Sequence, residues 1–199
     1  MITQKKIAIT GGIGSGKSTV AQILREKGFP VFSCDEIYRE ITQDYSYIQA
    51  ISVEFPEVVK DGEIDRALLS SQVFNDENKR KKLNSIAHPL VVDALLQRMN
   101  TCNTALVFAE VPLLFEGGFE RLFDAVFVVV REHSARIQAV QARDGLNATD
   151  ITARMNAQFD YESEENQNRL NNSNVFLLKN DDSFANLNKN VEDIIQKIV

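Results

Sequence analysis

The chain has 199 residues, of which 44% are apolar and 25% are charged. This length and composition predict one compact domain, or one with a small appendage, and argue against a disordered chain, a collagen or a membrane span. The formal net charge of −6 has the wrong sign for non-specific binding to nucleic acid. Any anionic ligand must therefore be held by a few local groups.

Cysteine usage and the N-terminal sequence indicate the cellular compartment of the protein. Cys34 and Cys102 are too few for a disulfide framework, which favours a reducing compartment. The N-terminus lacks the apolar core and cleavage site of a signal peptide, and the longest apolar run is too short to span a bilayer. We expect a soluble cytoplasmic protein without a membrane partner; the sequence does not define its oligomeric state.

Short, unbroken apolar runs alternate with longer segments of helical spacing. Runs of this kind are typical of strands buried on both faces. The runs lie at residues 7–9, 31–32, 105–109 and 125–130, with a weaker one at 175–178. Helical spacing follows the first run and recurs at 184–198. The alternation predicts an α/β fold with a parallel sheet flanked by helices.

Two stretches interrupt this alternation. Residues 36–99 show helical patterns and an acidic turn but no convincing strand, so we interpret them as an inserted helical subdomain. A polar helical stretch at 134–170, named here the lid segment, is long enough to form a mobile lid. The remainder, residues 1–35, 100–133 and 171–199, is then the core.

Within the subdomain, His88-Pro89 predicts a kink or break in a helix running from about 78 to 99. His88 and His133 have no second ligand at metal-binding spacing, so a structural metal site is not expected, and His88 is interpreted as a packed or capping residue. The basic run at 79–82 is interpreted as a solvated helix face.

A glycine-rich motif stands between the first strand and the following helix. It matches the phosphate-binding P-loop pattern, in which backbone N–H groups and a helix N-terminus converge on a phosphate. Lys17 would bridge the β- and γ-phosphates of ATP, and the Ser18 hydroxyl would ligate Mg²⁺. The expected nucleotide-binding residues are Gly11, Gly12, Ile13, Gly14, Ser15, Gly16, Lys17, Ser18 and Thr19.

Two carboxylates follow predicted strands, where ligands of parallel sheets bind. Asp35 could accept a proton from an attacking hydroxyl, or it could be the N-cap of the helix at 36–41. Glu110 could hold Mg²⁺ through water, or it could be a solvated strand end.

Arginines in the lid segment are candidates for binding the transferred phosphate. Phosphoryl transfer needs cations around the equatorial oxygens. Arg136 and Arg143 are seven positions apart and so share a helix face, and Arg154 follows. The alternative is a solvated charged face.

Several motifs, taken in order, resemble the dephospho-coenzyme A kinase family across residues 6 to 199. The resemblance rests on the narrow Thr-Gly-Gly-Ile-Gly-Ser-Gly-Lys-Ser form of the loop and on the segments at 61–66, 73–74, 86–91, 111–116, 142–146 and 153–158. It implies a P-loop kinase with a core, a helical substrate domain and a lid. The implied reaction is ATP-dependent phosphorylation of the ribose 3′-hydroxyl of dephospho-coenzyme A, the last step of coenzyme A synthesis.

The resemblance also implies roles for single residues. It favours Asp35 as the catalytic base, with Lys17 and Arg143 acting on the phosphates and Mg²⁺ at Ser18. Arg136 is a further catalytic candidate, chosen for its place on the same helix face as Arg143. The residues implied at the dephospho-coenzyme A cleft are Thr10, Asp35, Arg66, His88, Leu113, Leu114 and Glu116.

The chain departs from the family pattern at two positions. Ser33 stands where the family usually has a first Asp, before Cys34-Asp35. Ala139 stands where the lid usually has an Arg, and Arg136, one turn earlier, could substitute for it. Two rival readings are another small-molecule or nucleoside-monophosphate kinase on the same scaffold and a nucleotide-dependent switch, although the guanine-reading Asn-Lys-x-Asp motif of switch GTPases is missing.

Overall fold

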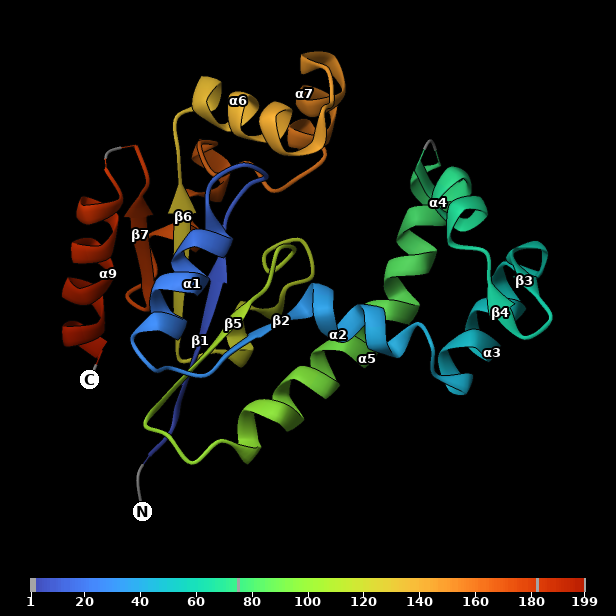
Figure 1. Cartoon of the computed structure of the whole chain (residues 1–199), viewed down its shortest axis with the longest axis horizontal. Coiled ribbons are helices and arrows are strands. Elements are labelled where there is room, and N and C mark those ends of the chain that lie inside the picture. The colour runs from blue at the N-terminus through green and yellow to red at the C-terminus, as the bar shows by residue number, and fades with distance from the viewer. Residues whose placement is uncertain (1–2, 75, 182, 199) are drawn as a thin grey trace. The chain divides into compact units, whose positions relative to one another are not determined.

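The larger β-sheet of the chain has five strands. The computed structural model describes residues 3–74, 76–181 and 183–198. The strand order is β2-β5-β1-β6-β7. β1 pairs in parallel with β5 and β6, and β6 pairs in parallel with β7. The predicted α/β fold with a parallel sheet is confirmed (Figure 1). The strands are β1 (Lys5–Thr10), β2 (Val31–Ser33), β5 (Leu106–Glu110), β6 (Ala125–Val130) and β7 (Val175–Lys179).

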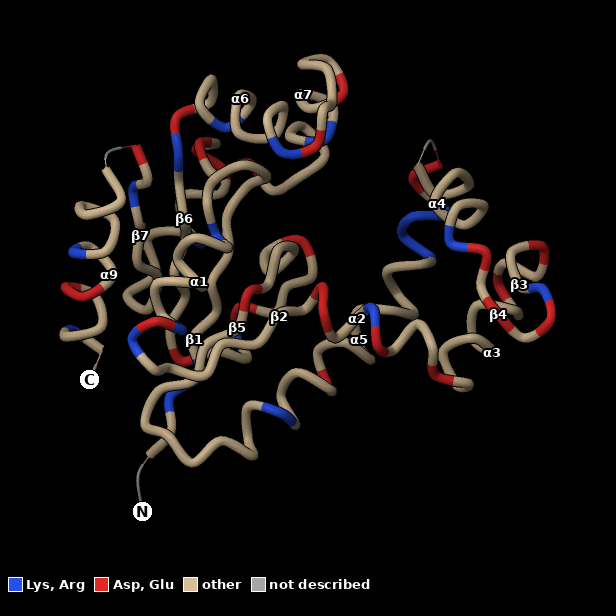
Figure 2. The backbone as a smooth tube through the Cα atoms, in the orientation of Figure 1, with Lys and Arg blue, Asp and Glu red and all other residues tan. Residues whose placement is uncertain are grey.

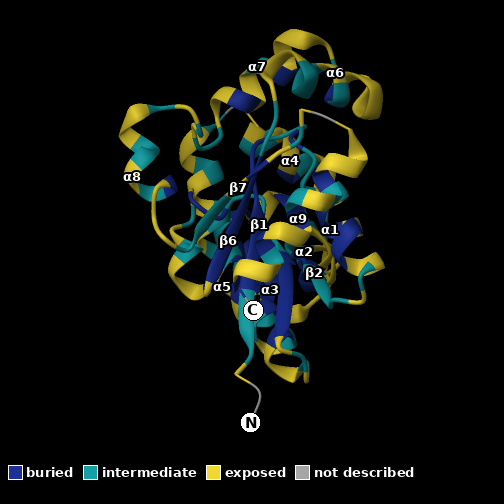
Figure 3. Ribbon diagram, turned by 90° about the vertical axis from the view of Figure 1, so that its left-hand side faces the viewer, coloured by how far each residue is buried: buried dark blue, intermediate teal, exposed yellow. Residues whose placement is uncertain are grey.

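Successive side chains of the central strands are buried on opposite faces of the sheet, which explains the unbroken apolar runs. Ile7, Ile9 and Phe127 pack with α1 (Lys17–Glu26) and α9 (Phe184–Ile198). Ala8, which points to the other face, is equally buried. The central strands β1 and β6 are accordingly mostly dark blue in Figure 3.

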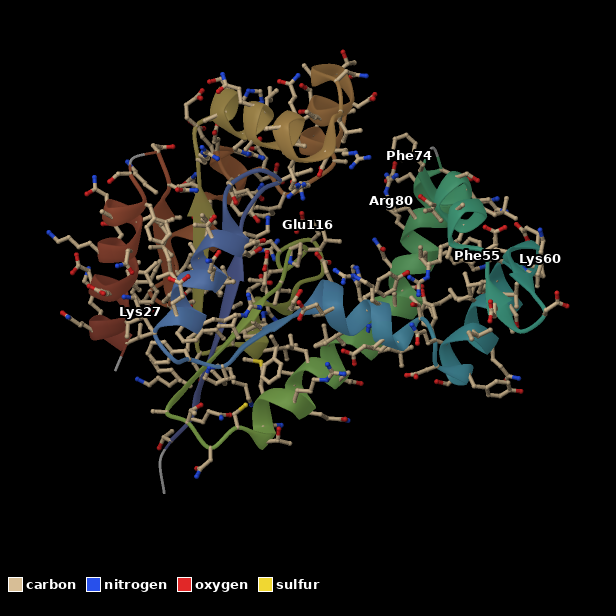
Figure 4. All side chains as sticks on the ribbon, in the orientation of Figure 1. Lys27, Phe55, Lys60, Phe74, Arg80 and Glu116 are labelled. Carbon is tan, nitrogen blue, oxygen red and sulfur yellow. The ribbon has the colours of Figure 1, made fainter. Side chains whose placement is uncertain are left out.

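The two helices on the first face are also joined at their surface. Lys27, just after α1, forms an ion pair with Glu192 of α9 (Figure 4 labels Lys27). The end of α1 is therefore held against the C-terminal helix.

The chain divides into two compact units. The first comprises Met1–Phe32 and Cys102–Val199, and the second is Ser33–Thr101. The segment that the sequence marks as an inserted subdomain, 36–99, falls within the second unit. Its helices are α2 (Cys34–Ile41), α3 (Tyr45–Glu54), η1 (Pro56–Val58), α4 (Arg66–Phe74) and α5 (Glu77–Thr101).

A short hairpin in the second unit was not expected from the sequence. β3 (Val59–Lys60) pairs antiparallel with β4 (Glu63–Ile64). Asp61 and Gly62 have φ values of 52° and 81°, which suit a two-residue turn with positive φ at both positions. The Asp-Gly dipeptide was the available signal, but strands of two residues are too short for a periodic pattern.

Of the kink or break expected at His88-Pro89, the break is wrong, because α5 continues through Pro89. Pro89 is exposed, so the carbonyl that loses its partner lies toward solvent. Ala87 before the proline and Val91, Val92 and Leu95 after it are buried. Packing on both sides of Pro89 therefore stabilises one helix across it.

The lid segment contains two helices with a small core of their own. α6 (His133–Asp144) and α7 (Ala148–Asn156) pack through Val140, Ile151 and Met155 and lie beyond the carboxyl end of β6, at the top of Figure 1. η3 (Glu164–Asn166) and α8 (Gln167–Leu170) follow, and η2 (Phe119–Leu122) precedes β6. Within the described ranges, no helix is long and apolar enough to cross a membrane.

Candidate functional site

The P-loop connects β1 to α1, and its glycines are required by conformation and by close contacts. Gly14 and Gly16 have φ values of 77° and 99°. A Cβ on Gly14 would lie 2.6 Å from the carbonyl oxygen of Arg136, and one on Gly11 would lie 2.3 Å from that of Val129. Gly16 is the N-cap of α1 and offers no side-chain cap. No side-chain cap therefore competes with an anion at the start of α1.

Lys17 lies against its own loop. Its Nζ donates to the carbonyl oxygens of Gly11 and Gly12, at 2.8 and 3.1 Å. These bonds place the ammonium group at the mouth of the loop, where a bound phosphate would need it.

Ser18 and Glu110 bring two oxygen ligands together. The Ser18 hydroxyl donates to Oε1 of Glu110 over 2.8 Å. Glu110 is the last residue of β5 and pairs with Ile9 of β1, so both side chains lie at the carboxyl edge of the sheet. Such oxygens suit Mg²⁺. The described residues contain no group of three or more His, Cys, Asp or Glu that could hold a metal.

Three side chains outside the P-loop hold its backbone. Nε of Arg136 donates to the Ile13 carbonyl at 3.0 Å, and Oε1 of Gln158 accepts the Ile13 N–H at 2.7 Å. Nδ2 of Asn180 donates to the Ser15 carbonyl at 2.8 Å. Neither Gln158 nor Asn180 is assigned a role from the sequence alone. Asn180 directly follows β7, so the strand-end argument applied to Glu110 could have identified it.

The two lid arginines share α6 but have different partners. Arg136 is half-buried, and burial lowers the pKa of its guanidinium group, which nevertheless stays protonated. Arg143 is largely exposed and donates from Nε and Nη2 to the carboxylate of Asp144, at 2.7 and 2.8 Å. These hydrogen bonds raise the pKa of Arg143 and lower the pKa of Asp144. Of these two arginines, Arg136 has a described hydrogen bond to the P-loop, whereas the described bonds of Arg143 go to Asp144.

A cavity of about 360 Å³ adjoins the P-loop. Ser15 is 1% exposed, and its Oγ has no hydrogen-bond partner among the described residues. The Tyr161 hydroxyl lies 3.4 Å from Oγ1 of the fully buried Thr10, and burial raises the pKa of Tyr161. The lining residues are Gly12, Ser15, Val129, Val130, Arg131, Glu132, Arg136, Tyr161, Glu162 and Asp181.

The loop after β5 joins an aromatic cluster. Phe115 stacks on Phe159 with ring centroids 4.6 Å apart, and the Arg169 guanidinium lies 5.0 Å from the Phe115 centroid. Oε1 of the exposed Glu116 accepts the Phe159 N–H at 2.8 Å (Figure 4 labels Glu116). Of the residues implied at the substrate cleft, Leu113 is half-buried, whereas Leu114 is fully buried and supports the loop from inside.

In the second unit, the start of α2 answers a question left open by the sequence. Ser33 is the N-cap of α2, and its Oγ accepts the Glu36 N–H at 3.4 Å. Asp35 lies in the first turn and is exposed. Asp35 is therefore not the cap, and the departure from the family pattern at Ser33 preserves a capping residue.

A second cavity, of about 270 Å³, lies within this unit. Arg66 lines it and donates from Nη2 to Oγ1 of Thr42 at 2.7 Å. The hydroxyls of Tyr38 and the buried Tyr47 lie 3.0 Å apart at the same cavity. His88 is half-buried on α5.

The basic run at 79–82 makes local contacts. Lys81 pairs with Glu77 at 2.7 Å, and Lys82 pairs with Glu54. Arg80, labelled in Figure 4, donates to the Phe74 carbonyl at 3.4 Å. Figure 2 shows acidic and basic residues interspersed in each unit. These contacts agree with a solvated helix face.

Known proteins resemble the chain over most of its length. A family model described as dephospho-CoA kinase matches residues 5–186. A dephospho-CoA kinase of Deinococcus radiodurans is 41% identical over 154 residues, covering 75% of this chain and 74% of the relative. One from Thermus thermophilus is 34% identical over 192 residues, covering 96% and 91%. The crystal structure of TT1252 from Thermus thermophilus superposes with a TM-score of 0.82 and 32% identity, covering 99% of both chains.

Proposed function

The chain belongs to the dephospho-CoA kinase family, whose members carry out the last step of coenzyme A biosynthesis, and we propose which of its residues perform that reaction. The enzyme is a kinase and takes ATP as phosphate donor. The proposed transfer goes from the γ-phosphate of ATP to the ribose 3′-hydroxyl of dephospho-CoA.

The nucleotide phosphates are held at the P-loop. The observation that carries this assignment is the uncapped start of α1 behind two glycines with positive φ, with Lys17 directed at the loop. The phosphates would lie along residues 14–19, where the loop passes into the first turn of α1. Lys17 exchanges a carbonyl partner for the β- and γ-phosphate oxygens as ATP binds.

The proposed magnesium ligands are Ser18 directly and Glu110 through water. Their 2.8 Å hydrogen bond supports this assignment, because Oγ of Ser18 and Oε1 of Glu110 lie close enough to share one ion and its water. When bound, Mg²⁺ would neutralise charge on the β- and γ-phosphates.

Asp35 is the proposed base. Its carboxylate accepts the proton of the 3′-hydroxyl as that oxygen bonds to the γ-phosphorus, while the bond to the β–γ bridging oxygen breaks and ADP leaves with that electron pair. The exposure of Asp35 and the capping of α2 by Ser33 support this role, since the carboxylate is not used to begin the helix.

Arg143 and Arg136 are the proposed phosphate-facing arginines of the lid segment. Arg143 must exchange Asp144 for a phosphate oxygen, whereas Arg136 supplies positive charge from its place on the P-loop. Compensation by Arg136 for the arginine missing at Ala139 remains part of this proposal.

The acceptor is proposed to contact Arg66, His88, Leu113 and Glu116. Thr10 and Leu114 are fully buried, so they would act by supporting neighbours. A cytoplasmic location, suggested by the cysteine usage, completes the proposal.

The test is an ADP-release assay on the purified chain with dephospho-CoA, AMP, CMP and shikimate as acceptors. We expect turnover only with dephospho-CoA. Stimulation by a nucleoside monophosphate or shikimate instead would favour the rival assignment to another small-molecule kinase on this scaffold.

A further inference from the structure

The lid segment contacts Ile13 of the P-loop through the side chain, the backbone N–H and the carbonyl of that residue. Its side chain packs against Val140, Ile151 and Met155, which form the small core of α6 and α7. Its N–H donates to Gln158, and its carbonyl accepts from Arg136. Ile13 therefore belongs to the P-loop by sequence and to the lid segment by its contacts.

The approach of the two segments is close at the next residue as well. A Cβ on Gly14 would lie 2.6 Å from the Arg136 carbonyl oxygen and 3.0 Å from Cγ2 of Val140. The backbone of α6 thus lies directly over the loop (Figure 1). A displacement of α6 would therefore break or strain its contacts with residues 13 and 14.

The direction of the Ile13 N–H has a consequence for phosphate binding. An anion at the start of α1 is held by successive N–H groups that point inward from the loop. The bond to Gln158 occupies the Ile13 N–H. Because the peptide between Gly12 and Ile13 is planar, the same bond orients the Gly12 carbonyl, which accepts the Ser15 N–H at 3.1 Å. The position of Gln158 therefore constrains where the N–H groups that follow residue 13 begin to converge.

We propose that Gln158 is a positioning residue for the nucleotide phosphates, which couples the lid segment to the shape of the P-loop through Ile13. Gln158 touches neither substrate in this role; it acts through the loop. The inference deepens the proposed function and rests on the P-loop being the nucleotide site.

The experiment uses Gln158→Met in the full chain, with ADP as the probe in calorimetric titration. Methionine keeps the unbranched shape but cannot accept the hydrogen bond as glutamine does. We expect ADP affinity to fall about fivefold, the effect of one hydrogen bond. KM for ATP should rise in parallel, while KM for dephospho-CoA and the melting temperature stay near the parent values.

Two further variants serve as a control and as a second test of the contact. Gln141→Met replaces an exposed glutamine of α6 for which no side-chain contact is described, and it should leave ADP affinity unchanged. Ile13→Ala removes the side-chain contact with the lid segment and should also weaken ADP binding. The double variant should lose less than the product of the two effects, because both act on one residue.

Lys17→Met separates this inference from the assignment on which it rests. If Lys17→Met binds ADP normally, the nucleotide site itself is wrong. If Lys17→Met loses ADP and Gln158→Met does not, the nucleotide site stands and the positioning role is overturned. Equal changes in both KM values, or an equal loss in Gln141→Met, would also overturn it.

Discussion

Two substitutions at the start of α2 separate catalysis from helix capping. Ser33 caps the helix, and Asp35, two residues later, is exposed in the first turn. Asp35→Asn preserves the shape of the side chain but removes its ability to take a proton at neutral pH. Ser33→Ala removes the cap and leaves the carboxylate in place. We expect the first to affect turnover and the second to affect stability.

The magnitudes follow from these positions. A general base contributes about 10²- to 10⁴-fold, so kcat of Asp35→Asn should fall by at least about 100-fold. Loss of a negative charge from the first turn costs about 0.3–1 kcal/mol, or at most about 4 °C in melting temperature for a chain of this size. Ser33→Ala should cost about 0.5–1 kcal/mol, the low end of the capping range, because the cap hydrogen bond is long at 3.4 Å.

The assay is ADP release at saturating ATP and dephospho-CoA, paired with thermal unfolding of each variant. Near-normal kcat in Asp35→Asn would refute the assignment of Asp35 as base. A comparable loss of kcat in Ser33→Ala would point instead to the geometry at the start of α2, since the carboxylate is then still present.

Three further predictions concern the P-loop and the lid segment. If Arg136 compensates for the missing lid arginine, Arg136→Ala and Arg143→Ala should each lower kcat by about tenfold or more; unchanged turnover in Arg136→Ala alone would rule compensation out. Gly14→Ala should abolish ADP binding in titration, whereas Gly28→Ala, which has a similar φ of 85° but open space around it, should lose only stability. Hydrogen bonds donated at the start of α6 lower the pKa of Glu132 from 4.5 to about 2, so its stabilising effect is complete above 4.5 and is lost as the pH falls toward 2. The difference in melting temperature between the parent and Glu132→Ala should therefore narrow over that window, and a constant difference would contradict the shift.

The strands could be predicted because burial on both faces leaves a direct mark on sequence. The run at 125–130 coincides with β6, and the run at 105–109 differs from β5 by one residue at each end. Strand ends are less well defined than strand centres, since one more residue extends the ladder only if a neighbour can pair with it. The same uncertainty left Asp35 open as the cap of a helix at 36–41, whereas α2 begins at Cys34 and Ser33 is its cap.

The supports of the P-loop could not be predicted from spacing. Gln158 and Ile13 are 145 positions apart, and Asn180 and Ser15 are 165 apart. Local propensity carries no information about such pairs, which form only when the lid segment and the end of β7 reach the loop. Composition likewise could not show that Ile13, a residue of a glycine-rich loop, is part of a hydrophobic core.

The hydrogen bonds from the Lys17 ammonium group to two P-loop carbonyl oxygens affect which anions the loop retains. Because Gly11 and Gly12 already accept hydrogen bonds from the ammonium group, an incoming anion competes with those carbonyls for its N–H donors. A single orthophosphate or sulfate recovers little more than it displaces, whereas a triphosphate also reaches the N–H groups at the start of α1. In a cell rich in small anions, this internal competition favours retention of a chelating polyphosphate over simpler ions.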